Sequence, residues 1–133
     1  MTDWYDGRAR ATFTITAGGI TPAVAAAGSF EITGGTAGAG NEVSAVRIDG
    51  VNLIGAAVPH TGDNVTTAAD VATAISAYVS NPDYTATSSG SQVLIVAAVA
   101  GAAPNGKLVI PYPAGDVTTA GATSMTGGAE QLT

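Results

Sequence analysis

The sequence contains no cysteine, few aromatic residues and few basic residues. Without cysteine the chain forms neither disulfide bonds nor thiolate zinc sites, so both kinds of stabilising framework are excluded. Four basic residues stand against ten acidic ones, which gives a net charge of −6. Because nucleic acids and anionic membranes are bound through a positive surface, we expect no nucleic-acid partner and no membrane partner. No apolar run reaches the roughly 20 residues that span a bilayer.

The composition favours an assembly component over a free enzyme. At 133 residues the chain is expected to form a single domain. Alanine, glycine and threonine fill 63 of the 133 positions. Such small side chains bury little area each, and burial contributes only about 25 cal/mol per Å². We therefore expect modest stability that is increased by contacts with neighbouring molecules. The N-terminus, MTDWYDGRAR, is polar and acidic, so we expect no export by a standard secretory signal.

Alternation of apolar and polar residues predicts strands in the first part of the chain. Residues 9–16 and 28–33 both alternate with a period of two. Residues 41–55 predict a hairpin, because the Asp49-Gly50 pair is preferred in a tight type I′ turn. The incoming strand is expected to place three side chains on one face: Ser44, Val46 and Ile48.

One helix is predicted over about residues 67–80. Thr67 and Asp70 have the spacing of a capping box. Asn81-Pro82 is expected to end the helix, since a residue before proline avoids the helical region. Apolar residues recur at spacings of three and four and form one stripe, which must pack on a sheet: Ala68, Val71, Ala72, Ile75, Tyr78 and Val79.

The second half of the sequence predicts further strands. The apolar run 93–99 is typical of a central strand covered on both faces, and residues 107–113 predict a strand closed by Pro111 and Pro113. The glycine clusters 33–41 and 126–128 are interpreted as turns, because neither has the G-K-[ST] of a phosphate-binding loop. The predicted fold class is α+β, with a mostly antiparallel sheet or small sandwich, one packed helix and a β-rich content.

The predicted organisation is an N-terminal arm, residues 1–16, leading into a single domain, residues 17–133, with a Gly/Thr-rich C-terminal tail. Asp3 and Asp6 offer a carboxylate pair for calcium, but the alternating acids and distant glutamate of an EF-hand loop are missing. We therefore expect neither metal nor cofactor there. Aromatic and arginine side chains are typical of interface anchors, and four of them make the arm a candidate partner-binding segment: Trp4, Tyr5, Arg8 and Arg10.

His60 is the sole histidine, and Asp63 lies three residues after it. A nucleophile–histidine–acid arrangement needs an activated nucleophile, and no serine here has the G-x-S-x-G surroundings of one. We interpret this stretch as a loop that leads to a helix N-terminus, with acids that complement the helix dipole. Asn64-Val-Thr66 matches a glycosylation sequon, which we interpret as accidental. The chain is expected not to be an enzyme.

From residue 34 to about residue 128 the chain resembles a module of tailed-bacteriophage virion proteins. Four features carry the resemblance: the hairpin VRIDGVNL from residue 46, the helical segment 69–75, NPDYTA from residue 81, and APNG from residue 103 with the closing MTGG. The resemblance implies a location in the virion and no catalytic residues. It implies partners such as the major capsid protein or other virion proteins, and a homo-oligomer on a symmetric surface, with a trimer favoured.

Three hypotheses about function follow from the sequence. The first is a capsid decoration or cement protein that clamps neighbouring capsid subunits. The second is a tail component: a tube or adaptor protein, or a receptor- or glycan-binding module whose exposed Tyr84 and Tyr112 would stack on sugar rings. The third is a hydrolase that uses His60 and Asp63. The first hypothesis is favoured because the chain reads as a free-standing domain with an arm.

Overall fold

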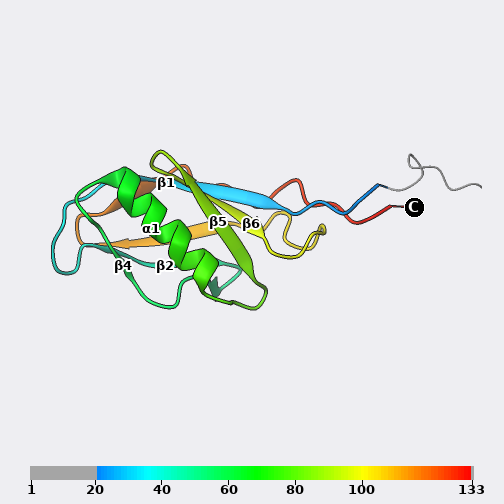
Figure 1. Ribbon diagram of the computed structural model, residues 1–133, viewed down its shortest axis with the longest axis horizontal. Helices are drawn as coiled ribbons and strands as arrows, with labels where there is room; N and C mark the ends of the chain where they lie inside the picture. Colours follow the sequence, from blue (N-terminus) through cyan, green and yellow to red (C-terminus); the bar gives the residue numbers. More distant parts are fainter. Residues whose placement is uncertain (1–20, 133) are drawn as a thin grey trace, which may run out of the picture.

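The computed structural model describes residues 21–132, and it has the α+β fold class that the sequence predicts (Figure 1). The predicted strand 9–16 and the arm 1–16 lie outside these residues. One helix packs against mostly antiparallel strands. The elements in chain order are β1 (Ala27–Gly34), β2 (Glu42–Ile48), β3 (Val51–Asn52), β4 (Val58–Pro59), α1 (Asn64–Ala77), β5 (Tyr84–Ser89), β6 (Gln92–Ala97), β7 (Val109–Ala114) and β8 (Thr118–Ala120).

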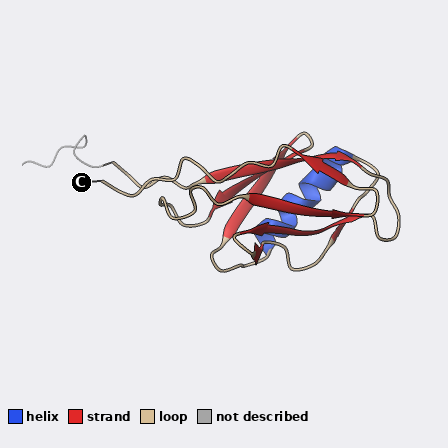
Figure 2. Ribbon diagram, turned by 180° about the vertical axis from the view of Figure 1, so that it is seen from behind, coloured by secondary structure: helices blue, strands red, loops and turns tan. Residues whose placement is uncertain are grey.

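The strands form two antiparallel sheets of four strands each. The first sheet has the order β5-β6-β1-β8, so that β1 lies beside β6 from the second half of the chain. In the second sheet β2 pairs with β3 and β4 on one side and with β7 on the other. From behind, these strands lie in front of α1 (Figure 2). The helix makes more contacts with β5 than with any other strand, and it also contacts β6, β1 and β4.

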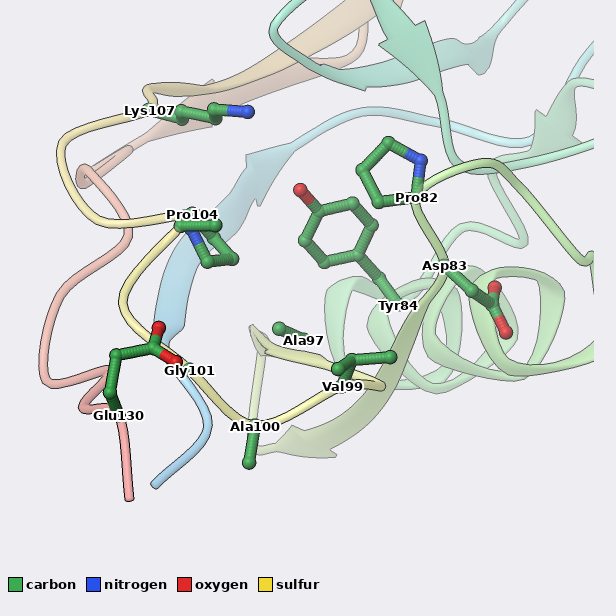
Figure 3. A pocket seen from close by; sticks show the side chains of 11 residues that line it. Pro82, Asp83, Tyr84, Ala97, Val99, Ala100, Gly101, Pro104, Lys107 and Glu130 are labelled. Carbon is green, nitrogen blue, oxygen red and sulfur yellow. The ribbon is translucent and has the colours of Figure 1, made fainter. Parts of the chain in front are cut away.

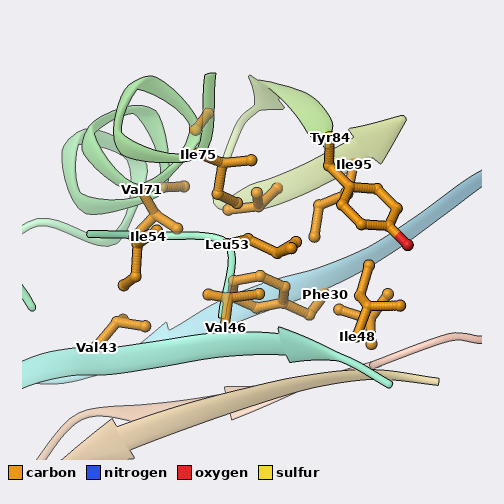
Figure 4. Packing of buried hydrophobic residues seen from close by; sticks show 14 of the residues in the cluster. Phe30, Val43, Val46, Ile48, Leu53, Ile54, Val71, Ile75, Tyr84 and Ile95 are labelled. Atoms are coloured by element: carbon orange, nitrogen blue, oxygen red, sulfur yellow. The ribbon is translucent and has the colours of Figure 1, made fainter. Parts of the chain in front are cut away.

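A single buried cluster joins the helix to both sheets. In Figure 4, Val71 and Ile75 point from α1 toward Phe30 and Leu53, and β2 lies on the opposite side of these residues. Phe30 and Ile75 are fully buried. Burial of large apolar side chains is the main favourable term in folding, and here these few residues supply it within a chain rich in alanine and glycine.

The β2–β3 hairpin confirms the predicted tight turn. Asp49 and Gly50 both have positive φ, 52° and 78°, as a type I′ turn requires. The expectation for Ser44 is wrong, because that side chain is exposed whereas Val46 and Ile48 are buried. The register between β2 and β7 shifts between Val43 and Ala45, and such a β-bulge interrupts the alternation of faces.

The helix begins earlier than the capping box predicts. Asp63 is the N-cap, and its side chain accepts hydrogen bonds from the backbone N–H of Thr66 at 3.0 Å and from its hydroxyl at 2.7 Å. Thr67 is fully buried, and its hydroxyl donates to the Asp63 carbonyl oxygen at 2.8 Å. Asp70 is exposed on the second turn. The helix ends at Ala77, because Tyr78 already has extended backbone angles. The expected end at Asn81-Pro82 is therefore wrong, and Tyr78 and Val79 are exposed residues outside the helix.

Two other strand predictions are corrected. Strand β6 is central in its sheet but is covered on one face only, so that Val93 and Ile95 are buried while Leu94 is 41% exposed. Pro111 and Pro113 lie within β7 instead of ending it. At these two positions the backbone nitrogen faces away from β2, so no N–H is needed for pairing with that strand. Val109 has the same orientation, and its N–H donates to the Thr123 carbonyl at 3.1 Å instead of to β2.

Candidate functional site

The two terminal segments of the described chain pair with each other at one end of the molecule. Residues 21–27 (blue) and 126–132 (red) run side by side away from the sheets in Figure 1. Three pairs of reciprocal backbone hydrogen bonds of 2.8–2.9 Å hold them: Thr21 with Leu132, Val24 with Ala129, and Ala27 with Thr126. We call this pair of segments the terminal ribbon. The glycine cluster 126–128 therefore belongs to the ribbon, and its interpretation as a turn is wrong.

The loop between β6 and β7 packs against the base of the ribbon. The Gly101 N–H donates to the Val24 carbonyl at 3.0 Å, and the Gly106 N–H donates to the Met125 carbonyl at 2.7 Å. The Asn105 side chain both donates to the Gly128 carbonyl and accepts from its N–H, at 2.8 and 2.9 Å. These bonds fix residues 101–106 relative to the ribbon, so that this end of the molecule is a defined surface.

A mostly apolar pocket of about 380 Å³ opens at this end (Figure 3). Tyr84 and Ala97 are buried residues in its wall, whereas Val99 at its margin is 76% exposed. Because the Tyr84 ring also belongs to the hydrophobic core, it separates the pocket from the core. The residues that line the pocket come from three segments, which are the β5 entry (Pro82, Asp83 and Tyr84), the β6–β7 region (Ala97, Val99, Ala100, Gly101, Ala103, Pro104 and Lys107) and the ribbon (Glu130).

Charged groups of both signs surround the pocket. Lys107 forms an ion pair with Asp49, with Nζ and Oδ2 3.3 Å apart. The carboxylate of Glu130 accepts the Ala102 N–H at 2.7 Å, which holds it against the loop. In Figure 3 the Tyr84 hydroxyl points toward the side on which Lys107 lies. Burial raises the pKa of Tyr84 above its ordinary value of 10.0, and the nearby Lys107 ammonium opposes this effect. The phenol therefore stays neutral at physiological pH and acts as a hydrogen-bonding group.

His60 and Asp63 direct their hydrogen bonds to different partners. His60 is 2% exposed. Its Nδ1 accepts the Gly62 N–H at 2.9 Å, so Nε2 carries the proton and donates to Asn64 Oδ1 at 3.1 Å. Asp63 directs its carboxylate to the first turn of the helix instead, and the Thr66 hydrogen bonds lower its pKa from the usual 3.8. Both ring nitrogens of His60 thus serve the turn that precedes α1.

A second carboxylate, Asp116, ties the β1–β2 loop to the chain that leaves β7. Its Oδ1 accepts the Thr36 N–H at 3.0 Å, and its other oxygen accepts the Thr36 hydroxyl. These hydrogen bonds lower the pKa of Asp116 from 3.8. The Asn41 side chain accepts the Asp116 N–H at 3.1 Å. The glycine cluster 33–41 begins with the last two residues of β1, and the predicted turn is confirmed for residues 37–40, which form the bends and the turn.

The two tyrosines expected to stack on sugars are differently placed. Tyr84 is 1% exposed, so its ring faces cannot stack on a ligand in solvent, and this expectation is wrong. Tyr112 is 44% exposed on β7, where the Arg47 guanidinium lies 5.4 Å from its ring centroid. Such an arrangement is favourable as a cation–π contact and occupies a face of the ring.

The remaining candidate residues fall into two groups. Asp3, Asp6 and the four arm residues (Trp4, Tyr5, Arg8 and Arg10) lie outside the described residues. Asn64 of the sequon is the first residue of α1 and accepts the His60 hydrogen bond. Within residues 21–132, no three histidine or acidic side chains gather as a metal site, and no helix is long and apolar enough to cross a membrane.

The sequence reasoning missed the pocket and the ribbon. The Ala103-Pro-Asn-Gly106 turn and the lysine that follows it were the available signals for the pocket, but they do not reveal that Tyr84 and Glu130 lie beside them.

The chain was compared with protein-family models, with curated proteins and with solved structures, and nothing matches it in any of the three.

Proposed function

We propose that the chain is a non-enzymatic structural protein of a phage virion, and that it decorates the capsid by binding neighbouring capsid subunits. The observation that carries the proposal is the terminal ribbon. It brings the two ends of the described chain, Thr21 and Leu132, together at a point away from the sheets. A folded body with a projecting ribbon is suited to linking subunits of a symmetric shell.

The segment that precedes Thr21 supplies the groups expected of an anchor. It contains Trp4 and Tyr5, and two of the four basic residues of the chain, Arg8 and Arg10. Tryptophan, tyrosine and arginine are the residue types that contribute most at the centres of protein interfaces. The resemblance of residues 34–128 to phage virion modules points to the same class of partner.

The edges of both sheets are protected against pairing with another chain, as suits a protein that is present in many copies and must not aggregate. At the edge strand β5, the Ser76 hydroxyl of α1 accepts the Ala86 N–H at 3.0 Å and donates to the Ala86 carbonyl at 2.9 Å. At the edge of the second sheet, Pro111 and Pro113 offer no N–H for another strand. With these edges protected, partners would bind through side chains of the folded domain and through the N-terminal arm, and not by adding a strand to a sheet.

The hydrogen bonding of His60 also supports a non-enzymatic role. A general base needs an unshared ring nitrogen within reach of its substrate, whereas Nδ1 and Nε2 of His60 are both used by Gly62 and Asn64.

Sedimentation of the protein with capsid shells tests the proposal. We expect the full chain to sediment with shells and to raise their melting temperature. Deletion of residues 1–10, or replacement of the arm anchors by alanine (Trp4, Tyr5, Arg8 and Arg10), should abolish both effects. Val79→Ser is a matched control, because Val79 is 78% exposed on the folded body. Sedimentation that survives the deletion would show that the arm is not the anchor, and failure of the full chain to bind shells would refute the decoration role.

A further inference from the structure

Apolar side chains are exposed at the pocket beside the ribbon. Val99 at its margin is 76% exposed, and Val24 on the ribbon is 48% exposed. Val24 is held next to the pocket, because its carbonyl accepts the N–H of Gly101, which lines the pocket, at 3.0 Å. Exposed apolar groups beside a concave site are typical of a surface that binds a partner.

Two carboxylates give the pocket an unbalanced negative charge. Lys107 is the one cationic residue of the pocket lining, and its ammonium is paired with Asp49 at 3.3 Å. The charges of this pair cancel, so Asp83 and Glu130 leave the pocket with two negative charges. In Figure 3 these two residues lie on opposite sides of Val99. A positively charged group that entered between them would be attracted to both.

Each of these carboxylates has an oxygen that is available to a partner. Oε2 of Glu130 accepts the Ala102 N–H at 2.7 Å, and Oδ1 of Asp83 accepts the Ser80 N–H at 3.2 Å. From the remainder of residues 21–132, no donor is bonded to the second oxygen of either group. The backbone bonds hold both carboxylates in place, so a cation would meet groups that are already oriented, and less entropy is lost on binding.

We infer that this pocket receives an arginine side chain of the capsid subunit that the protein decorates. The inference deepens the proposed function and rests on it for the identity of the partner. The methylene groups of the arginine would pack on the apolar wall, to which Val99 and Pro104 belong, and its guanidinium would bind the carboxylate of Glu130. Arginine is favoured over lysine because a guanidinium is more weakly hydrated than an ammonium and packs on apolar and aromatic surfaces.

The charge of the folded domain favours the same partner. Residues 1–20 contain two acidic and two basic residues, so the net charge of −6 lies on the rest of the chain. Both basic side chains of that part are already engaged, Lys107 with Asp49 and Arg47 with the Tyr112 ring. A domain of this charge is attracted to a basic surface and repelled by an acidic one. A basic patch on the capsid subunit therefore complements this end of the molecule.

Titration of the ¹⁵N-labelled full chain with the peptide acetyl-Ala-Arg-Ala-amide tests the pocket without shells. We expect saturable shifts of the Gly101 and Ala102 amide signals, with a Kd on the order of millimolar for a single side chain. A peptide with norleucine in place of arginine should bind about tenfold more weakly, because it lacks the charged hydrogen-bond donor. Equal binding of the two peptides, or no shift with either, would overturn the inference.

A charge-neutral variant locates the binding site. Glu130→Gln/Asp83→Asn keeps the acceptor oxygens for the backbone bonds and removes both charges, so it should weaken peptide binding about tenfold. Glu31→Gln/Asp70→Asn is the matched control, because it removes the same charge at exposed positions that do not line the pocket. Equal loss in both variants would overturn the inference, since it would reduce the effect to overall charge.

A second pair of variants tests the pocket by its shape. Ala103→Phe, which fills the pocket from an exposed position, should abolish the peptide shifts, whereas Ala39→Phe in the β1–β2 loop should leave them unchanged. Shifts of the pocket signals in Arg8→Ala/Arg10→Ala without peptide would instead place an arginine of the arm in the pocket, which would overturn the inference.

Sedimentation with capsid shells tests the identity of the partner. Glu130→Gln/Asp83→Asn should raise the Kd for shells about tenfold, and Glu31→Gln/Asp70→Asn should not change it. Normal binding of the pocket variant would overturn the inference and leave the decoration role in place. Failure of the unaltered chain to bind shells would refute the proposed function itself, so the two failures are distinguishable.

Discussion

Replacement of His60 by alanine should destabilise the fold strongly. The ring is 2% exposed, and its removal leaves a cavity and deprives the Gly62 N–H and the Asn64 amide of their partners. Loss of a buried ring with two hydrogen bonds costs about 2–4 kcal/mol in the free energy of unfolding. For a domain of this size, that corresponds to a fall of roughly 10 °C in the melting temperature.

Gly35 provides a double-mutant test of the same packing. A Cβ placed on Gly35 would lie 2.8 Å from Cδ2 of His60, and its φ of 144° is unfavourable for any side chain. Gly35→Ala is therefore expected to destabilise the fold both by the clash with the His60 ring and by the unfavourable φ, and His60→Ala removes the clash. We expect the cost of Gly35→Ala to fall by about 1 kcal/mol or more in the His60→Ala background. Differential scanning calorimetry measures all four proteins; an unchanged melting temperature in His60→Ala, or strictly additive costs, would refute the structural role of the ring.

Three further predictions concern the helix, acid stability and the sheet edge. Asp63→Ala should lower the melting temperature and Asp70→Ala should not, because Asp63 is the N-cap. A lower melting temperature in Asp70→Ala alone would instead support the capping box that the sequence predicts at Thr67 and Asp70. The folded-state pKa values of Asp63 and Asp116 are lowered from 3.8, so their stabilisation is present above that value and is lost as the pH falls through the folded-state values. Urea unfolding at a series of pH values should therefore show a weaker acid dependence in Asp63→Asn/Asp116→Asn, and an unchanged dependence would contradict the assignment. Ser76→Ala should lower the free energy of unfolding by about 1 kcal/mol and increase aggregation, as measured by light scattering, because Ala86 on the edge of β5 loses its hydrogen-bond partner.

Features encoded by short stretches of sequence were predicted well. The Asp49-Gly50 pair specifies positive φ at both positions by local chemistry alone, and the turn is found where expected. Phe30 and Ile32 alternate with polar residues in β1 and are fully buried. The helix was recognised by its apolar spacing, but its start was misplaced because Asp63 and Thr67 are both acceptable caps. Burial of Thr67 decides between them, and burial is a property of the whole fold.

Features that join distant segments were not predictable from these patterns. The reciprocal bonds of the ribbon recur every third residue, at Thr21, Val24 and Ala27, so the alternation that identifies a regular strand is absent. The pocket depends on Tyr84, Lys107 and Glu130, which the chain topology alone brings together. Pro111 and Pro113 were interpreted as the end of a strand, since their position on an edge is visible only once the pairing with β2 is known.

The most direct test of the proposed function is immunogold labelling of intact virions produced from the genome that encodes this chain, with an antibody raised against the folded domain. Electron microscopy should show label distributed over the head, and the label should disappear from particles assembled with protein that lacks residues 1–10. Label confined to the tail, or particles without label, would contradict a capsid decoration role.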